Sequence, residues 1–126
     1  MNIPKDLQYT QDHEWVKFKE EGVALVGLTD FAQEQLGNIV FVNLPEVGDV
    51  VTVGQGFGDV ESVKAVSDLV APITGVVTAI NEELLDAPEG INEAAYDAWL
   101  IEVSEITEKA DLFNADEYET HCNGEG

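Results

Sequence analysis

Short runs of Val, Ile and Phe recur along the chain, and Gly, Pro, Asn and Asp separate them. Runs of this length with such breaks are typical of β-strands joined by tight turns. "HEWVKFK" and "VALVGL", separated by "EEG", predict a hairpin in which successive residues from Trp15 to Phe18 point to alternate sides. "NIVFVNL" predicts another strand, which Pro45 stops. The pattern as a whole favours a small all-β sandwich or barrel.

Helical patterns are secondary to these strands. "TDFAQEQLG" predicts a short helix with Thr29 or Asp30 as N-cap and with Gln33 placed as in a capping box. Gly37 is placed to end this helix. No flexible linker divides the chain, so we expect residues 1–126 to form a single domain.

The C-terminal segment "ITEKADLFNADEYETH" predicts one or two short helices, with Thr107 and Asn114 as caps. We expect about residues 120–126 to form a flexible tail. The chain's one cysteine, Cys122, lies in this polar stretch, so no intramolecular disulfide is possible. A single cysteine in a mobile tail fits a reducing compartment.

Two segments resemble each other. "PEVGDVVT" (Pro45 to Thr52) and "PITGVVT" (Pro72 to Thr78) share a Pro-x-x-Gly start followed by Val-Val-Thr, with one extra residue in the first copy. Lys64 falls between them. The repetition predicts a pseudo-two-fold sandwich with its axis near a central hairpin, although Val-Val-Thr after a Gly turn is also ordinary strand chemistry.

The charge balance changes the picture of possible partners. The chain has 26 acidic residues against five lysines and no arginine, a formal net charge of -21 and a pI of about 4.1. Such a surface repels phosphate backbones and anionic membranes, so we expect neither nucleic acid nor membrane as a partner. Basic protein surfaces fit better, and the plainest reading of the charge is a well-solvated surface. The N-terminus has no apolar signal region, and no apolar run approaches a membrane span.

Motifs for metal binding and hydrolysis are missing from the sequence. His13, His121 and Cys122 are too few and wrongly spaced for a zinc site, and the carboxylates lack calcium-loop spacing. We therefore expect no metal. The sequence contains no Gly-x-Ser-x-Gly elbow, which makes an ordinary hydrolase a poor hypothesis.

One cation stands out against this acidic background. "ESVKAVSDL" places Lys64 at the tip of a turn between two predicted strands, with small residues at 62, 65 and 67 that leave its amine unobstructed. A lysine at a hairpin tip is usually an ordinary solvated turn residue. A tight turn also holds the amine in a reproducible position for another enzyme, which favours a modification site.

A series of stretches in one order identifies a family. "HEWV", "VGLTDFAQEQLGNIVFVNLPEVGD", "ESVKAVSDLVAPITG", "NEELLDAPEGIN" and "WLIEV" closely resemble the H-protein family of the glycine cleavage system over nearly the whole chain. The resemblance implies an all-β, lipoyl/biotinyl-type barrel-sandwich hybrid with short peripheral helices, including a C-terminal helix. It also implies that lipoic acid is attached covalently to Lys64.

The resemblance assigns recognition residues as well. In the family, the glutamate three residues before the lysine and the glycine eleven after it guide the lipoate ligase or the lipoyl/octanoyl transferase. Glu61 and Gly75 occupy these positions. Without the resemblance, Glu61 reads as a solvated strand carboxylate and Gly75 as a turn glycine.

The family pattern further implies that the loaded arm enters a surface cleft in which Glu14 and Asp68 face its amine. Both residues are present, Glu14 on the first hairpin and Asp68 on the strand after Lys64. Asp12 departs from the hydroxyl residue expected there in some relatives. "NEAAYDAWLI" departs too, because it looks shortened and lacks the glycine that often precedes the tryptophan, here Trp99.

By resemblance the protein is a carrier and not an enzyme. It would take an aminomethyl group from a pyridoxal-phosphate glycine decarboxylase and deliver it to a tetrahydrofolate-dependent aminomethyltransferase, and dihydrolipoamide dehydrogenase would reoxidise it. We expect a monomer. The expected location is the cytoplasm of a bacterium or archaeon, or the mitochondrial matrix if the source is eukaryotic.

Rival functions remain at this point. A biotin carrier usually has its lysine between methionines, whereas Val63 and Ala65 flank Lys64. A lipoyl domain of a 2-oxoacid dehydrogenase would have Asp before the lysine and linkers to larger domains. A lipoyl relay that donates its cofactor to other lipoate-dependent enzymes is a closer rival. An acidic scaffold would leave Lys64 unmodified.

Overall fold

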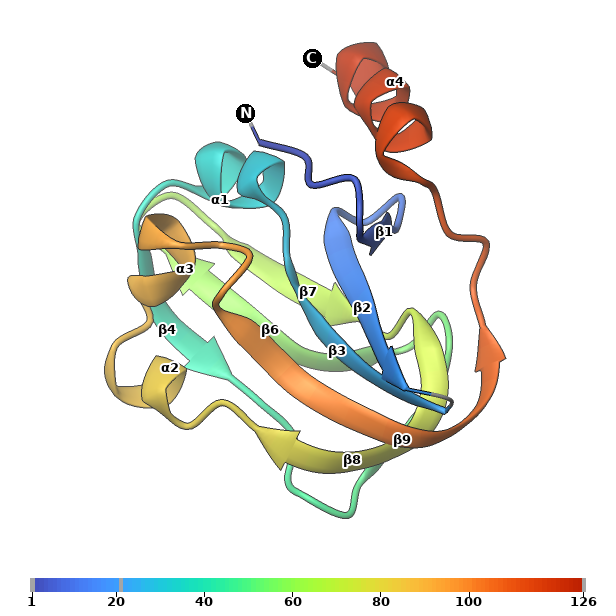
Figure 1. The fold of residues 1–126 in the computed structure, drawn as a ribbon. Coiled ribbons are helices and arrows are strands. Elements are labelled where there is room, and N and C mark those ends of the chain that lie inside the picture. The colour runs from blue at the N-terminus through green and yellow to red at the C-terminus, as the bar shows by residue number, and fades with distance from the viewer. Residues whose placement is uncertain (1, 21, 126) are drawn as a thin grey trace.

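The structure, a computed structural model, describes residues 2–20 and 22–125. Within them, a six-stranded and a three-stranded antiparallel sheet pack around a shared core (Figure 1). The larger sheet has the order β1 (Gln8–Tyr9), β2 (Glu14–Glu20), β3 (Val23–Leu28), β9 (Trp99–Lys109), β8 (Ile73–Ile80) and β5 (Val50–Val51). The smaller has the order β4 (Ile39–Asn43), β6 (Gly56–Ser62) and β7 (Val66–Val70). The helices are α1 (Asp30–Leu36), α2 (Glu83–Asp86), α3 (Gly90–Glu93) and α4 (Ala115–Glu125). The predicted all-β class with short helices is confirmed.

The predicted hairpin is formed by β2 and β3, with Trp15 opposite Gly27. A Cβ atom at Gly27 would lie 2.5 Å from the Trp15 ring, so glycine is what admits the indole. Val16 packs in the core between the sheets, whereas Trp15 packs in a second cluster with Tyr9 and Tyr118. Both faces at the start of β2 are therefore buried, although strict alternation would bury only one.

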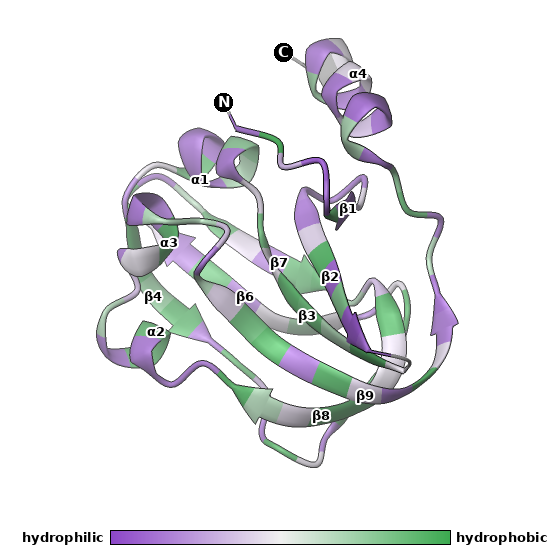
Figure 2. Ribbon diagram, viewed as in Figure 1, coloured by the Kyte–Doolittle hydropathy of each residue, from purple (hydrophilic) through white to green (hydrophobic). Residues whose placement is uncertain are grey.

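The main core lies between the two sheets. Val60 on β6, Val77 on β8 and Val103 on β9 are fully buried in it. Each such side chain contributes about 1.5–3 kcal/mol relative to an exposed one. Figure 2 shows these strands carrying hydrophobic segments, while α4 is predominantly hydrophilic. The core holds the small sheet, which carries the predicted lysine turn, firmly against the large one.

Helix α1 begins and ends where the sequence predicts. Thr29 is the N-cap, because its side chain accepts a hydrogen bond of 3.1 Å from the Ala32 amide. The side chain of Gln33 donates to Asp30 at 2.7 Å, so these two residues bond to each other within the first turn. Gly37 ends the helix with φ +79°, a value that favours glycine, and its amide donates to the Gln33 carbonyl. The chain then enters β4.

The C-terminal prediction needs correction in its first half. Thr107 lies inside β9 and is not a helix cap, because β9 pairs with β8 to its last residue, Lys109. The tertiary pairing thus extends the strand through a segment whose local sequence is helix-compatible. Asn114 does precede α4, where its side chain accepts from the Glu117 amide at 2.8 Å and the Glu117 carboxylate accepts from the Asn114 amide at 2.9 Å.

The setting predicted for Cys122 is wrong. Residues 120–125 are helical, and Cys122 is buried with Tyr118 in the second apolar cluster. The two residues are four apart, so they share one face of α4. The ring of Tyr118 stacks on Tyr9 with the centroids 4.6 Å apart, which docks α4 on the N-terminal segment. Gly126, at the end of the predicted tail, lies outside the described residues.

The two repeated segments lie side by side in the large sheet. The strand in Pro45 to Thr52 is β5, and that in Pro72 to Thr78 belongs to β8. They pair antiparallel, with Val51 opposite Gly75. Any antiparallel pair has a local two-fold between its strands, so the predicted two-fold of the sandwich near the central hairpin stays a prediction.

Candidate functional site

Lys64 lies at the tip of the connection between β6 and β7, as predicted, and it is exposed. Ser62 holds this turn: its amide donates to the Ala65 carbonyl at 2.8 Å, and its Oγ accepts from the amides of Lys64 and Ala65 at 3.1 and 3.0 Å. Hydroxyl groups that bond to the backbone two or three residues ahead stabilise tight turns. The lysine turn, Ser62 to Ala65, is therefore built by residues adjacent in sequence.

The lysine turn also rests on the segment that follows α1. The Val63 amide donates to the Asn38 carbonyl at 3.1 Å. A Cβ atom at Gly37 would lie 3.1 Å from Cε of Lys64, so the lysine side chain runs close over this glycine. The sequence predicted Gly37 as a helix end only. Its contact with Lys64 joins residues 27 positions apart, so no local sequence pattern could have predicted it.

A row of exposed side chains crosses the small sheet next to the lysine turn. Phe41 on β4, Glu61 on β6 and Val66 on β7 are cross-strand neighbours. Phe41 is 53% exposed and Val66 is 64% exposed, while Glu61 between them is exposed as well. Large exposed apolar side chains around a charged one are typical of contact surfaces for other proteins. Glu61 is thus displayed beside Lys64, as its predicted recognition role requires.

Glu14, in contrast, is only 1% exposed. Its Oε2 accepts a hydrogen bond of 2.8 Å from the Val70 amide, which connects the start of β2 with the end of β7. Its Oε1 is buried and has no hydrogen-bond partner among the described residues. The carboxyl lines a cavity of about 400 Å³ with Thr10, Gln11, Asp12, Val53, Gly54, Val70, Ala71, Pro72, Ala110, Asp111 and Phe113. We call this space the Glu14 cavity.

Burial raises the pKa of the Glu14 carboxyl well above its usual range, the bond from the Val70 amide opposes this, and the nearby charge of Asp12 raises it further. A buried carboxyl with a free oxygen is costly unless a donor or a cation meets it. The Glu14 cavity is therefore suited to receive a positively charged or hydrogen-bond-donating group.

Comparison with known proteins decides which chemistry these features serve. The family model for the glycine cleavage H-protein matches residues 7–125. The chain belongs to the glycine cleavage H-protein family. Glycine cleavage system H proteins of Lachnoclostridium phytofermentans and Listeria innocua are 57% and 56% identical to it over 119 and 123 residues. The first alignment covers 94% of both chains, and the second covers 94% of this chain and 97% of the relative.

A solved structure agrees. The crystal structure of a glycine cleavage system H protein from Mycobacterium marinum matches with a TM-score of 0.91 and 42% identity, covering 97% of this chain and 99% of that one. Its barrel-sandwich fold confirms the predicted fold type. H-proteins carry covalently attached lipoate and are the carrier component of the glycine cleavage system, not themselves catalysts. The chain is therefore a lipoyl carrier whose partners belong to that system.

Gly75 plays a structural role that the sequence did not predict. It lies in β8, between residues where the register with β9 shifts, so the expected turn setting is wrong. A Cβ atom there would lie 2.5 Å from the Ser104 carbonyl oxygen and 2.6 Å from Val103. The close approach of the β9 backbone excludes any larger residue. Packing alone therefore explains a glycine at this position of an H-protein.

Asp68 does not line the Glu14 cavity. It is exposed on β7, directly opposite Asp59 on β6. Val70, which does line the cavity, is two residues along the same strand, so Asp68 shares its face about 7 Å away. Strand spacing thus puts Asp68 two residues from a residue that lines the cavity, between it and Lys64 in the chain. Like charges directly opposite each other destabilise a sheet, so the Asp59–Asp68 pair adds nothing to its stability.

The two departures from the family pattern fall in different places. Asp12 lines the Glu14 cavity, and its amide donates to Thr10 Oγ1 at 3.2 Å. An additional carboxylate therefore lies where a bound cation would be held. Trp99 starts β9 opposite Gly27 and packs with the second apolar cluster. The shortened segment before Trp99 thus lies on the α4 side of the large sheet.

Histidine and cysteine are close together but do not form a metal site. Nδ1 of His13 lies 2.8 Å from the Tyr118 hydroxyl, and the rings of His13 and His121 are 5.4 Å apart. Among the described residues, no group of three or more His, Cys, Asp or Glu side chains is arranged to hold a metal ion. In the same part of the chain, no helix is long and apolar enough to cross a membrane.

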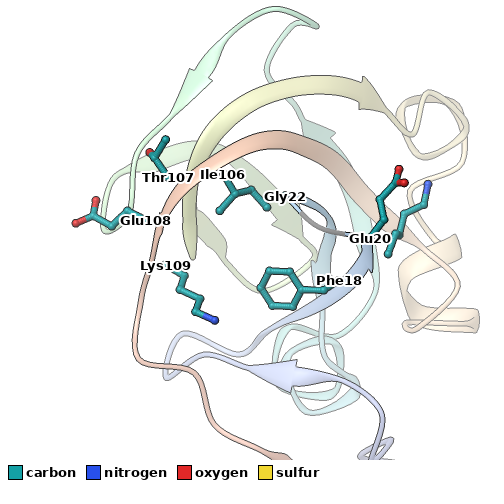
Figure 3. A pocket seen from close by; sticks show the side chains of 8 residues that line it. Phe18, Glu20, Gly22, Ile106, Thr107, Glu108 and Lys109 are labelled. Carbon is teal, nitrogen blue, oxygen red and sulfur yellow. The ribbon is translucent and has the colours of Figure 1, made fainter.

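A larger hollow of about 560 Å³ lies elsewhere, between the ends of β2 and β9 (Figure 3). Phe18 and Lys109 point toward each other across it, with the lysine ammonium 5.4 Å from the ring centroid. None of its lining residues belongs to the lysine turn or to the Glu14 cavity. Volume alone would therefore point to this hollow and not to the Glu14 cavity or the lysine turn.

Proposed function

We propose that Lys64 is the residue that carries lipoate, through an amide on its Nζ, and that residues 1–126 act as one lipoyl-carrier domain. The observation that carries this proposal is the lysine turn, which presents an exposed amine between two paired strands. Other lysines have different surroundings: Lys19 forms an ion pair with Glu102 at 2.8 Å, and Lys109 lies over Phe18. Attachment at Lys64 requires no rearrangement of the fold.

The attached group would supply a disulfide that takes up the aminomethyl group together with the electron pair left by decarboxylation of glycine, and its dithiol would later give up two electrons on reoxidation. The chain's own residues tether and orient it. Ser62 keeps the turn in one conformation, and amide formation removes the lysine charge. Because the group stays tethered, its effective concentration near a docked partner is high. In this proposal glycine decarboxylase loads the arm, aminomethyltransferase unloads it, and dihydrolipoamide dehydrogenase reoxidises it.

Mass spectrometry tests the attachment site. The protein is incubated with lipoate and a lipoate ligase, and intact mass and peptide mapping locate the added group. One lipoyl increment on Lys64, and none in Lys64→Arg, is the expected result. A lipoyl group on Lys5, Lys17, Lys19 or Lys109, or one that persists in Lys64→Arg, would overturn the proposal.

Glu61 is proposed as a residue that the lipoate ligase or lipoyl/octanoyl transferase reads. Its exposure beside Lys64, in a row with two exposed apolar residues, supports direct contact with such an enzyme. Gly75 is proposed to assist recognition through the shape of the sheet, because the backbone of β9 packs against it. The two residues therefore act differently, one by contact and one by packing.

Glu14 and Asp68 are proposed to hold the cationic end of the loaded arm. Asp68 lies on the same face of β7 as Val70, and inside the cavity that Val70 lines Glu14 presents an oxygen with no hydrogen-bond partner in the described part of the chain. A cation that approaches Glu14 favours its ionised form and lowers its raised pKa. Entry of the amine would therefore ionise Glu14, and the resulting pair of charges would keep the amine protonated.

We further propose that the protein is a monomer. The edge strands of the large sheet, β1 and β5, have two residues each, and short edges resist pairing with other chains. The cytoplasm of a bacterium is the proposed location, because the relatives named above are bacterial proteins. Size-exclusion chromatography with light scattering tests the monomer, since a mass of twice 13.7 kDa would contradict it.

A further inference from the structure

Asn92, on α3, joins three parts of the chain near the lysine turn. Its Nδ2 donates to the Gln33 side chain at 3.0 Å and to the Gly37 carbonyl at 2.8 Å. Its Oδ1 accepts from the Ile39 amide at 2.8 Å. Figure 1 shows α1 and α3 at the end of the molecule where β6 connects to β7. A single side chain thus links the end of α1 with the beginning of β4.

One peptide unit connects Asn92 to the lysine turn. The amide of Ile39, which bonds to Asn92, and the carbonyl of Asn38, which accepts from Val63, belong to the same peptide plane. In a planar trans peptide the N–H and the C=O point in opposite directions. Fixing the N–H on one side therefore fixes the carbonyl on the other, and Val63 is next to Lys64.

The preceding peptide unit is held as well. Asn92 bonds to the Gly37 carbonyl, and Gly37 is the residue over which the Lys64 side chain runs. Gly37 has φ +79°, its amide makes the last bond of the helix, and Gly37 lies outside both α1 and β4. The bonds from Asn92 keep this segment in place. Hydrogen bonds in such a chain also polarise and strengthen one another.

We propose that Asn92 is a positioning residue for lipoate attachment: it holds the segment from Gly37 to Ile39, and this segment holds the lysine turn. The inference rests on the proposed function of Lys64. Asn92 contacts neither lipoate nor the attaching enzyme in this role. It limits the positions of the amine, so that the enzyme meets the amine already oriented.

The experiment combines backbone ¹⁵N relaxation with ligase kinetics for Asn92→Ala. The order parameters of Val63 and Lys64 should fall from about 0.85 toward 0.6 in the unmodified protein. The kcat/KM for lipoylation should fall about fivefold, the effect of losing roughly one hydrogen bond from the oriented state. A purely structural role would instead lower the melting temperature and leave the turn and the kinetics of the folded protein unchanged.

Two control variants test whether the effect runs from Asn92 through the Asn38–Ile39 peptide to Val63. Glu93→Ala changes the exposed neighbour on α3, and Gln33→Ala removes a partner of Asn92 that is not on the path to Val63. Both should retain wild-type order in the turn and wild-type kcat/KM. If Gln33→Ala loosens the turn as much as Asn92→Ala does, or if Asn92→Ala leaves it unchanged, the inference is wrong.

If Asn92→Ala does not fold, the lipoylation kinetics of Asn92→Asp test the inference instead. Aspartate keeps an acceptor for the Ile39 amide but replaces the donor to Gly37 by an oxygen. A two- to threefold lower kcat/KM supports the inference, and an unchanged value contradicts it. The proposed function fails separately, because it requires lipoate on Lys64 of the wild-type protein, whereas the relaxation data do not depend on lipoylation.

Discussion

The lysine turn and the Glu14 cavity place ionisable side chains in opposite surroundings. Lys64 is exposed, and its turn is held by local bonds between Ser62, Lys64 and Ala65 and by one bond from Val63 to Asn38. Glu14 is buried, and its cavity is lined by segments from four separate parts of the chain. An amine that foreign enzymes must modify has to be accessible. The role proposed for Glu14, holding a reactive cation away from water, requires instead a site with walls on several sides.

This contrast predicts which variants alter modification and which alter stability. Changes in the turn should affect lipoylation and leave folding nearly intact. Changes at the cavity should affect stability and its pH dependence and leave lipoylation intact. Changes in the packing of the large sheet, which supports both regions, should affect both lipoylation and stability.

Gly75→Ala should have the largest effect on stability. An added methyl group meets the β9 backbone, and overpacking of this kind costs about 2 kcal/mol. Urea unfolding measures the loss, with Gly124→Ala as control because a Cβ there meets no atom within 4 Å apart from its chain neighbours and the backbone of its own helix. Equal stability of the two variants would show that β9 moves aside easily. Lipoylation of folded Gly75→Ala then separates recognition from packing.

Glu14→Gln should stabilise the protein near neutral pH by on the order of 1 kcal/mol. The raised pKa means that the native carboxyl holds its proton to a higher pH than the unfolded one does. Stability from this group is therefore complete below the unfolded pKa, about 4.3, and is lost as pH rises toward the folded value. Glutamine stays neutral and avoids the loss.

Urea unfolding of Glu14→Gln at pH 4 and pH 8 checks this sign. The advantage over wild type should be small at pH 4 and larger at pH 8. Glu119→Gln, a change of an exposed glutamate on α4, should show no such trend. An advantage that is constant with pH would mean that Glu14 ionises in the native state as readily as in the unfolded chain.

Glu61→Ala should lower the rate of lipoylation about fivefold, as expected for the loss of one contact with the attaching enzyme. Its free energy of unfolding should change by less than about 0.5 kcal/mol, because the side chain is exposed. Steady-state kinetics with lipoate ligase and urea unfolding give the two numbers. A normal rate in the folded variant would remove Glu61 from recognition and leave it as a solvated residue.

The smallest expected effect concerns the loaded arm. Its aminomethyl group is lost when the nitrogen lone pair expels the thiolate, and protonation of the nitrogen removes that lone pair. Asp68→Asn and Glu14→Gln should each shorten the lifetime of the loaded protein about threefold, which corresponds to half a pKa unit of the amine. Intact mass over time, without aminomethyltransferase, measures this decay. Wild-type lifetimes in both variants would exclude these carboxylates from protecting the amine.

Local patterns predicted much of the fold correctly. The hairpin of β2 and β3, the helix from Asp30 to Leu36 and the lysine turn all follow from residues close together in the sequence. The failures have a common cause. Thr107 was predicted as a cap and Cys122 in a mobile tail because their neighbours are polar. Pairing of β9 with β8 and docking of α4 on Tyr9 override that local preference.

The sequence by itself determined the family, the class of fold and the place of Lys64 at a turn, because strand alternation, turn chemistry and a chain of motifs are local properties. Only the tertiary structure decided that Glu14 is buried with one oxygen that lacks a hydrogen-bond partner among the described residues, that Gly75 lies against β9, and that Asn92 bonds to the Ile39 amide. Each of these depends on residues more than 25 positions apart. Burial and its effect on pKa arise only when distant segments pack together and exclude water.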